Sequence, residues 1–120
     1  MQDFRTLKVW EKAHSLALQV YKLSMKFPSE EKFGLTIQMR RSAAAVPTHI
    51  AEGCGSLEGS DYGRYLQNAL RSACELEYQL LLSKDLTYTP PEVYSELEPR
   101  VIEVKKMLTA YIQKIRAGNL

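Results

Sequence analysis

Apolar and small residues between positions 35 and 53 recur at alternating steps of four and three, the period of one face of an α-helix. The positions on this face are Leu35, Met39, Ser42, Val46, Ile50 and Gly53. The other side is also short of charge, because no Asp, Glu, Lys or Arg occurs between residues 42 and 51. A helix that is apolar almost all round is covered on more than one side. We therefore expect the chain to self-associate, and the interface residues expected on this helix are Ile37, Ala44, Pro47 and Ala51.

Pro47 lies inside this predicted helix, where a proline removes one backbone hydrogen bond and presses its ring against the carbonyl of Ala43. The run Ser-Ala-Ala-Ala over residues 42–45 has little side-chain bulk, so a bend is sterically easy there. We predict a kinked second helix. The kink either wraps the helix around a core or opens a functional cleft, and the sequence leaves both interpretations open.

The first helix is predicted over residues 6–26, with Asp3 or Thr6 as its N-cap. Its core side holds Trp10, Ala13, Ala17, Val20, Ser24 and Phe27. A second stripe carries four lysines and no acidic residue, and these are Lys8, Lys12, Lys22 and Lys26. This lysine row is either a solvated face or a surface that follows nucleic-acid phosphates, since each lysine that neutralises a phosphate releases a counterion.

A Phe-Pro pair at residues 27–28 separates the first helix from the second, because the residue before a proline avoids helical backbone. The second helix is predicted to begin at Ser29, since the two glutamates that follow favour a helix N-terminus. It is predicted to end at Gly53 and Gly55, which adopt the left-handed conformation easily.

The third helix is predicted over residues 61–86, after a loop over residues 56–59 and with Ser60-Asp61 as its cap. Its core side holds Tyr62, Leu66, Ala69, Ala73, Leu76 and Leu80. The opposite side is a second regular stripe formed by Arg64, Asn68, Arg71, Glu75, Tyr78 and Leu82. This stripe starts basic and ends aromatic and apolar, so we interpret it as a packing seam for a subunit or an elongated ligand. Tyr78 and Leu82 are its expected interface residues.

The fourth helix opens with Thr-Pro-Pro-Glu at residues 89–92, which matches a capping box with proline in the first turn. Pro99 predicts a bend or a later start, and Gly118 ends the helix. Its apolar seam holds Tyr94, Leu97, Val101, Val104, Leu108, Tyr111 and Ile115. Four helices with short connections predict one domain over residues 1–120, an all-α, antiparallel up-and-down four-helix bundle.

Composition adds few constraints on function. The net charge of +2, from 16 basic and 14 acidic residues, does not by itself indicate nucleic acid, so that case depends on where the charges lie. The basic candidates outside the lysine row are Arg40, Arg41, Arg64 and Arg71. No run of about 18 apolar residues occurs, and Cys54 and Cys74 lack a pairing spacing. We expect a cytoplasmic protein with free thiols and no membrane partner.

Catalytic and metal-binding patterns are sparse. A di-iron bundle needs two Glu-x-x-His motifs, whereas this chain has one, from Glu11 to His14, and a reversed copy from His49 to Glu52. Cys54 follows a helix, whose C-terminus disfavours a thiolate. We therefore expect no enzyme activity, no metal and no cofactor.

Several short motifs together resemble one family. They are Leu7-Lys-Val-Trp10-Glu-Lys-Ala-His14, Phe27-Pro28, Gly34-Leu35, Gln38 with Arg40-Arg41, Val46-Pro47, Ile50-Ala51-Glu52-Gly53 and Glu75-Leu-Glu77-Tyr-Gln-Leu80. Over nearly its whole length the chain is similar to the four-helix-bundle proteins encoded in intervening sequences of bacterial 23S rRNA genes. A similar fold occurs in the accessory variability protein of diversity-generating retroelements, a pentameric barrel thought to engage RNA and a reverse transcriptase.

The resemblance implies a closed bundle that assembles into a ring, with a pentamer expected, and a family without a settled biochemical activity. This chain departs from the family pattern, which commonly has Ala-Asn at positions 48–49, arginine at Ser56 and glycine at Arg71. The loss of a basic residue at Ser56 weakens a contact between this loop and RNA. Arg71 alters the outer seam of the third helix.

The leading hypothesis is a non-enzymatic homo-oligomer that binds RNA or a ribonucleoprotein partner through its basic residues. The expected phosphate contacts are Lys8, Lys12, Lys22, Lys26, Arg40, Arg41, Arg64 and Arg71, with Tyr78 as a stacking or interface residue. The alternative is a protein-only scaffold or adaptor in which the same surfaces hold subunits and a protein client. A third interpretation, a metal-dependent bundle enzyme, requires bound metal.

Overall fold

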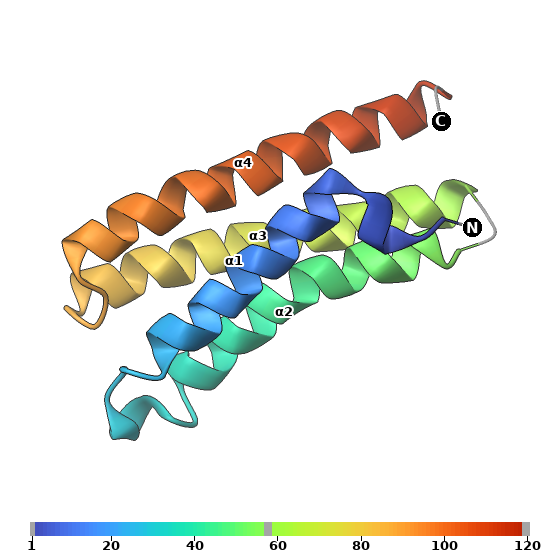
Figure 1. Cartoon of the computed structure of the whole chain (residues 1–120). Coiled ribbons are helices and arrows are strands. Elements are labelled where there is room, and N and C mark those ends of the chain that lie inside the picture. The colour runs from blue at the N-terminus through green and yellow to red at the C-terminus, as the bar shows by residue number, and fades with distance from the viewer. Residues whose placement is uncertain (1, 57–58, 119–120) are drawn as a thin grey trace.

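Four long helices make up most of the computed structural model, which describes residues 2–56 and 59–118. The helices are α1 (Lys8–Ser24), α2 (Leu35–Cys54), α3 (Gly59–Asp85) and α4 (Pro91–Arg116), and two short 3-10 turns are η1 (Phe4–Thr6) and η2 (Ser29–Glu31). They run in alternating directions, with both termini at one end (Figure 1). The predicted all-α, antiparallel up-and-down four-helix bundle is confirmed. None of the described helices has the length and apolar content that a membrane span needs.

The core follows the predicted helix faces closely in α2, α3 and α4. Met39 and Ile50 of α2, with Leu66 and Leu76 of α3, have no exposed surface, and Val101 of α4 is equally buried. On the first helix five of the six predicted core positions are buried, and the buried face is wider than predicted. The residues it adds to the predicted set are Val9, Leu16 and Leu23. Trp10 is only half-buried and packs against the edge of the core.

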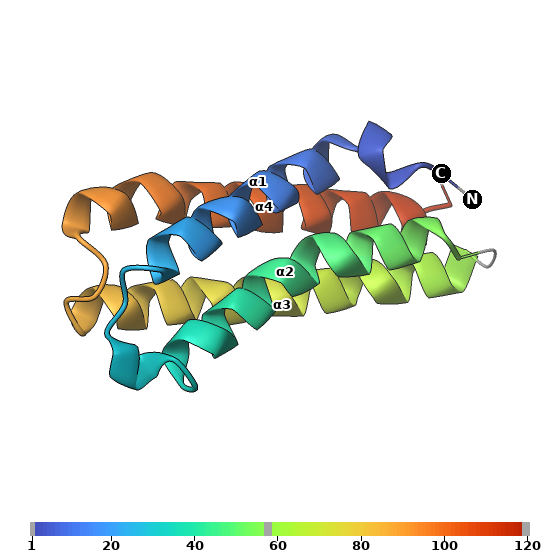
Figure 2. The same cartoon turned by 60° about the horizontal axis from the view of Figure 1, so that its bottom comes forward.

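The second helix begins at Leu35 and not at Ser29, so its predicted start is wrong. Residues 29–31 form the separate turn η2, and the Glu31 carboxylate reaches forward to accept a hydrogen bond from Leu35 N at 3.1 Å. This side chain satisfies one of the free N–H groups at the start of α2. Pro47 lies inside α2, which changes direction around its middle (Figure 2).

The end of α2 differs from the prediction in its backbone. Gly55 has φ −81°, in the right-handed helical region, and Gly53 lies within the helix. Gly53 is instead required by a close approach, because a Cβ built on it would lie 2.9 Å from Cδ1 of Tyr62 and 3.2 Å from Cβ of Tyr65. Its small size lets the end of α2 meet the start of α3.

The third helix begins at Gly59, two residues before the predicted start, so residues 60–61 lie in its first turn and do not precede it as a cap. The predicted loop over residues 56–59 falls partly at residues 57–58, outside the described residues. At the other end, the carbonyl of Ser83 accepts hydrogen bonds from Tyr88 N at 2.8 Å and Thr89 N at 3.1 Å. Thr87 has φ 66° in this turn, which leads the chain into α4.

The predicted capping box at α4 is wrong. Thr89 is buried, and its hydroxyl lies 2.7 Å from the Ser83 hydroxyl, so it is engaged with the end of α3. Pro90 occupies the N-cap position and has no side chain that can cap. The helix begins at once at Pro91 and continues through Pro99, which excludes the later start. Its predicted seam is buried from Leu97 to Leu108, and Ile112 is a further buried residue.

Candidate functional site

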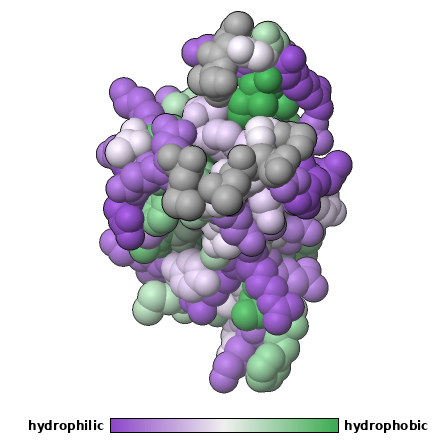
Figure 3. All heavy atoms as spheres, turned by 90° about the vertical axis from the view of Figure 1, so that its right-hand side faces the viewer, coloured by the Kyte–Doolittle hydropathy of each residue, from purple (hydrophilic) through white to green (hydrophobic). Residues whose placement is uncertain are grey.

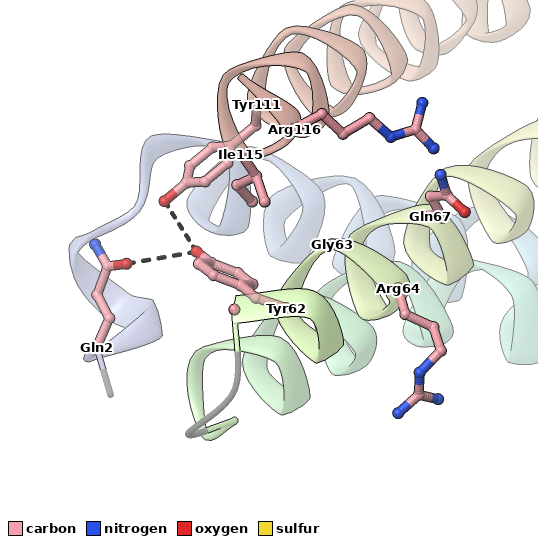
Figure 4. A pocket seen from close by; sticks show the side chains of 9 residues that line it. Gln2, Tyr62, Gly63, Arg64, Gln67, Tyr111, Ile115 and Arg116 are labelled. Atoms are coloured by element: carbon pink, nitrogen blue, oxygen red, sulfur yellow. Dashed lines mark hydrogen bonds between the residues drawn. The ribbon is translucent and has the colours of Figure 1, made fainter. Parts of the chain in front are cut away.

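A cleft of about 790 Å³ lies between α3 and α4, at the end of the bundle that holds both termini. We call it the α3/α4 cleft. Its lining residues are Gln2, Gly59, Tyr62, Gly63, Arg64, Gln67, Tyr111, Ile115 and Arg116. Figure 4 shows Ile115 pointing toward α3 at Gly63, Arg116 extending along the cleft on the side of Gln67, and Arg64 extending away from α4 at the outer edge. In the view toward this end of the molecule, mainly hydrophilic side chains surround small apolar areas (Figure 3).

Two tyrosines join the walls of the cleft. The Tyr62 hydroxyl donates to the Tyr111 hydroxyl at 2.9 Å and lies 3.4 Å from Gln2 Oε1 and 3.8 Å from Cys54 Sγ (Figure 4 draws the first two contacts). Burial and the hydrogen bond to Tyr111 raise the pKa of Tyr62 far above its ordinary value. Burial likewise raises the pKa of the Cys54 thiol. Both groups therefore stay protonated, so neither adds a negative charge at this end of the cleft.

The cleft continues along the bundle as a chain of hollows. A second hollow, of about 240 Å³, shares Gln67 and Arg116 with the first and adds Arg71. A third, of about 360 Å³, shares Thr109 and Gln113 with the second and extends along α4. It is lined by Ile102, Lys105, Lys106, Thr109, Ala110 and Gln113. From residue 102 to residue 116 this track is roughly 21 Å long at the rise of an α-helix.

Charge in α3 and α4 is strongly segregated by this fold. Residues 62–74 of α3 and residues 104–118, which include the second half of α4, contain no Asp or Glu. The antiparallel packing of α3 and α4 places these two segments beside each other at the end with the termini. The basic residues that they bring to one end are Arg64, Arg71, Lys105, Lys106, Lys114 and Arg116. Seven acidic residues lie instead between residues 75 and 103, toward the other end of the hairpin.

These cations differ in how they are held. Arg64 pairs with Asp61 at 3.2 Å and Arg71 donates to Asn68 at 3.1 Å, both on the exposed surface of α3. Lys105 Nζ contacts the Glu77 carboxylate at 2.5 Å, and this hydrogen bond raises the pKa of Lys105. Arg116 is exposed, and no ion pair is recorded for it in the described part of the chain.

The lysine row on α1 is less uniform than its sequence indicates. Lys12 forms an ion pair with Glu103 of α4 at 3.1 Å, so an acidic partner from another helix lies within the row. A hollow there also includes Glu103 among its lining residues. Lys8, Lys22 and Lys26 are exposed. The row therefore keeps three solvated lysines and one that is neutralised by α4.

Arg40 and Arg41 have different surroundings. Arg40 turns toward α1, where its Nε donates to Ser24 Oγ at 2.8 Å and its Nη2 donates to the carbonyl of Tyr21 at 3.3 Å. Its guanidinium also lies 5.0 Å from the centre of the Tyr21 ring. Arg40 thus satisfies groups at the C-terminus of α1 and is held against the protein. Arg41 is exposed.

An apolar groove of about 410 Å³ runs between the outer sides of α1 and α2. Its lining residues are Phe4, Trp10, His14, Ala17, Leu18, Tyr21, Ala44, Pro47, Thr48 and Ala51. Three of the four residues expected at a subunit interface on the second helix therefore line the same groove. Of the α1 residues that line it with them, Trp10 and Ala17 were predicted on the core side of that helix. Leu18, at 59% exposed, is a large apolar side chain open to solvent at this groove.

The remaining predicted interface residues lie elsewhere. Ile37 is half-buried on α2 and does not line the groove. Tyr78 of α3 is 62% exposed, while Leu82 packs against the bundle's own core and is half-buried. Of the eight expected phosphate contacts, only Arg64 and Arg71 line the cleft and its continuation.

Sequence reasoning missed Arg116 and Tyr111 of α4 as cleft residues. The sequence feature that could have indicated a basic surface here is the absence of acidic residues over 104–118. The same feature is expected from the helix dipole alone, because basic residues are favourable near a helix C-terminus. Tyr62 and Tyr111 were assigned to apolar core faces, and both do pack against the core while they line the cleft. Only the pairing of α3 with α4 brings these residues to one place.

Within residues 2–56 and 59–118, no group of three His, Cys, Asp or Glu side chains lies close enough to hold a metal ion. His49 Nδ1 lies 2.8 Å from Glu52 Oε1, which makes the reversed motif a local contact on α2. His14 stacks on Trp10 with ring centroids 4.9 Å apart.

Comparison with known proteins places this chain in a family. Residues 5–110 match the family model described as 23S rRNA-intervening sequence protein. The structure is similar to the 1.70 Å crystal structure of a protein with unknown function from the S23 ribosomal protein family of Bacteroides thetaiotaomicron VPI-5482. The two share 27% sequence identity with a TM-score of 0.81, and the match covers 88% of this chain and 95% of that one. No curated protein matches this chain. Because the family model spans most of its length, the chain belongs to the 23S rRNA-intervening sequence protein family.

Proposed function

We propose that this chain is a non-enzymatic, homo-oligomeric helical bundle of the cytoplasm that binds RNA or a ribonucleoprotein partner through its basic surface. The observation that carries the proposal is the distribution of charge in α3 and α4. Toward the open end of this hairpin, where the chain termini lie, residues 62–74 and 104–118 contain six basic residues and no acidic residue. A nucleic-acid backbone is the partner that such a concentration of basic residues favours, because phosphate contacts release counterions.

Self-association is supported by the apolar groove of α1 and α2. Trp10 and Leu18 stand beside Pro47 and Ala51 there, and a hollow apolar surface of this kind is typical of a protein–protein contact. The resemblance to ring-forming bundles makes a pentamer the expected assembly. Repetition of the basic end around a ring would multiply weak phosphate contacts into stronger binding.

The test measures RNA content and binding on the intact protein. The native assembly is purified at low salt with and without nuclease, and the absorbance ratio at the nucleic-acid and protein maxima is compared. Binding of a fluorescein-labelled single-stranded oligouridine is then followed by anisotropy over a salt series. We expect nuclease-sensitive nucleic acid in the purified assembly and an affinity that falls linearly with salt on logarithmic axes.

A protein-only scaffold is the competing function, and the apolar groove is the observation that favours it. If it is correct, the purified assembly carries no nucleic acid, oligouridine does not bind even at low salt, and a co-purifying protein is retained after nuclease treatment. That combination would overturn the RNA-binding proposal and leave self-association standing.

A further inference from the structure

We infer that the RNA strand of the proposed function lies in the α3/α4 cleft and its continuation along α4, and not on the lysine row of α1. This inference rests on the proposed function, since it names the surface that performs it. The occupant is a single strand of RNA, held mainly by its phosphates, with Tyr62 and Tyr111 beside the bases at the wide end.

The cleft and the two hollows that follow it adjoin one another, because each shares lining residues with the next, and the third is lined by α4 alone. We call this series of hollows the track. Its length of roughly 21 Å gives room for a short stretch of extended single strand. On the lysine row, the hollow around Lys12 is also lined by Glu103.

The charge along the track complements that of phosphates. Arg64, Arg71 and Arg116 line its first two hollows, and Lys105 and Lys106 line the third. None of the described residues that line these three hollows is acidic. Arg64 and Lys105 do have acidic partners, Asp61 and Glu77, but these partners do not line the hollows. On α1, Glu103 pairs with Lys12 at 3.1 Å and itself lines the hollow there.

Neutral side chains lie between the cations of the track. Gln67, Thr109 and Gln113 supply hydrogen-bonding side chains between the arginines, while Ile115 provides an apolar contact. Tyr62 and Tyr111 line the wide end, and their hydroxyls are held together at 2.9 Å. Aromatic rings beside a basic track are typical of single-strand binding, in which bases stack and phosphates meet cations.

The experiment compares two triple variants of the full-length protein that lose the same amount of charge. The cleft variant is Arg64→Gln, Arg71→Gln and Arg116→Gln, and the matched control is Lys8→Gln, Lys22→Gln and Lys26→Gln on α1. All six side chains are exposed, so both variants should keep the fold, which is checked by thermal melting followed by circular dichroism. The probe is the labelled oligouridine, measured over the same salt series as the wild type.

We expect the cleft variant to lower the slope of log affinity against log salt by roughly 2, because three phosphate contacts on a single strand each contribute about 0.7. The control should keep a slope close to that of the wild type. As a second measurement, a thiouridine-containing strand is crosslinked by light, and the modified residues are identified by mass spectrometry. Crosslinks at Tyr62 or Tyr111, and none at the exposed Tyr78, support the cleft.

Three results would overturn the inference while RNA binding itself stands. The first is an equal decrease of the salt slope in both triple variants, which would mean that only net charge matters. The second is a decrease confined to the lysine-row variant. The third is a smaller assembly of the cleft variant in light scattering, which would make the cleft a subunit contact. If the wild type does not bind the probe at any salt concentration, the proposed function fails, and the assignment of the cleft fails with it.

Discussion

The Tyr62 hydroxyl of α3 donates a hydrogen bond to the Tyr111 hydroxyl of α4 at 2.9 Å, and their ring centroids lie 5.7 Å apart. These residues are 49 positions apart in sequence, so the contact joins the first turn of α3 to the last turns of α4. It closes the inner wall of the cleft at the place where Ile115 and Gly63 meet.

Tyr111→Phe should destabilise the protein by about 1 kcal/mol, because it removes one hydrogen bond and leaves the part-buried Tyr62 hydroxyl with its longer contacts. The matched control is Tyr78→Phe, on an exposed ring without a recorded hydrogen bond. The free energy of unfolding is measured by urea denaturation. An equal loss of stability in both variants would contradict a role for the Tyr62–Tyr111 bond.

Stability should fall as the pH rises above about 9, near the ordinary pKa of a cysteine thiol. The pKa values of Cys54 and Tyr62 are both raised in the folded state, so the folded protein retains protons that the unfolded chain releases. Their contribution is fully present below the unfolded pKa values and is lost above them. The double variant Cys54→Ala and Tyr62→Phe should flatten this dependence in urea midpoints measured from neutral pH upward. If the double variant loses stability with rising pH as steeply as the wild type, groups other than Cys54 and Tyr62 cause the pH dependence.

Gly53→Ala should cost about 1–3 kcal/mol, because the new methyl group would lie 2.9 Å from the ring of Tyr62. Gly63→Ala is its counterpart within α3. There the methyl group meets Ile115 Cγ2 at 3.7 Å, an ordinary contact, and alanine should stabilise the helix by up to about 1 kcal/mol. Thermal melting of the two variants should therefore shift in opposite directions. Shifts of the same sign would mean that close packing is not what selects glycine at residue 53.

Arg40→Met should destabilise the bundle by about 1–2 kcal/mol, since it removes hydrogen bonds to Ser24 and to the carbonyl of Tyr21 at the end of α1. Arg41→Met changes the same charge at the next position, on an exposed side chain, and should stay within about 0.5 kcal/mol of the wild type. Urea denaturation of both variants checks the difference. If Arg41→Met lowers the free energy of unfolding more than Arg40→Met does, the assignment of Arg40 to the end of α1 is wrong.

If the chain self-associates through the apolar groove, as proposed, Leu18→Glu should dissociate the assembly, because the glutamate would place a charge in the groove. The protomer should stay folded, since Leu18 is 59% exposed. Phe33→Glu provides the control at a residue that is 87% exposed and lies outside the groove. Light scattering gives the mass, and circular dichroism confirms the helix content. A wild-type mass of a single chain would remove the basis for a subunit interface at this groove.

The sequence predicted the four helices and most of their buried faces, because helical periodicity is a local property that survives in any tertiary setting. It misplaced helix ends where side chains from other elements intervened. Thr89 matched a capping box, yet its hydroxyl is engaged with Ser83. Ser29 matched a helix start, yet Glu31 closes a separate turn and caps α2 at Leu35.

The sequence by itself determined that the chain forms amphipathic helices with one unusually uncharged segment, since those features depend on residue order along a single helix. Only the tertiary structure decided which charges act together. Antiparallel packing brought the acid-free parts of α3 and α4 side by side around a cleft, while Glu103 of α4 neutralised Lys12 in the lysine row. The physical reason is that electrostatic attraction depends on distance in space, and a helical pattern fixes only the distances within its own helix.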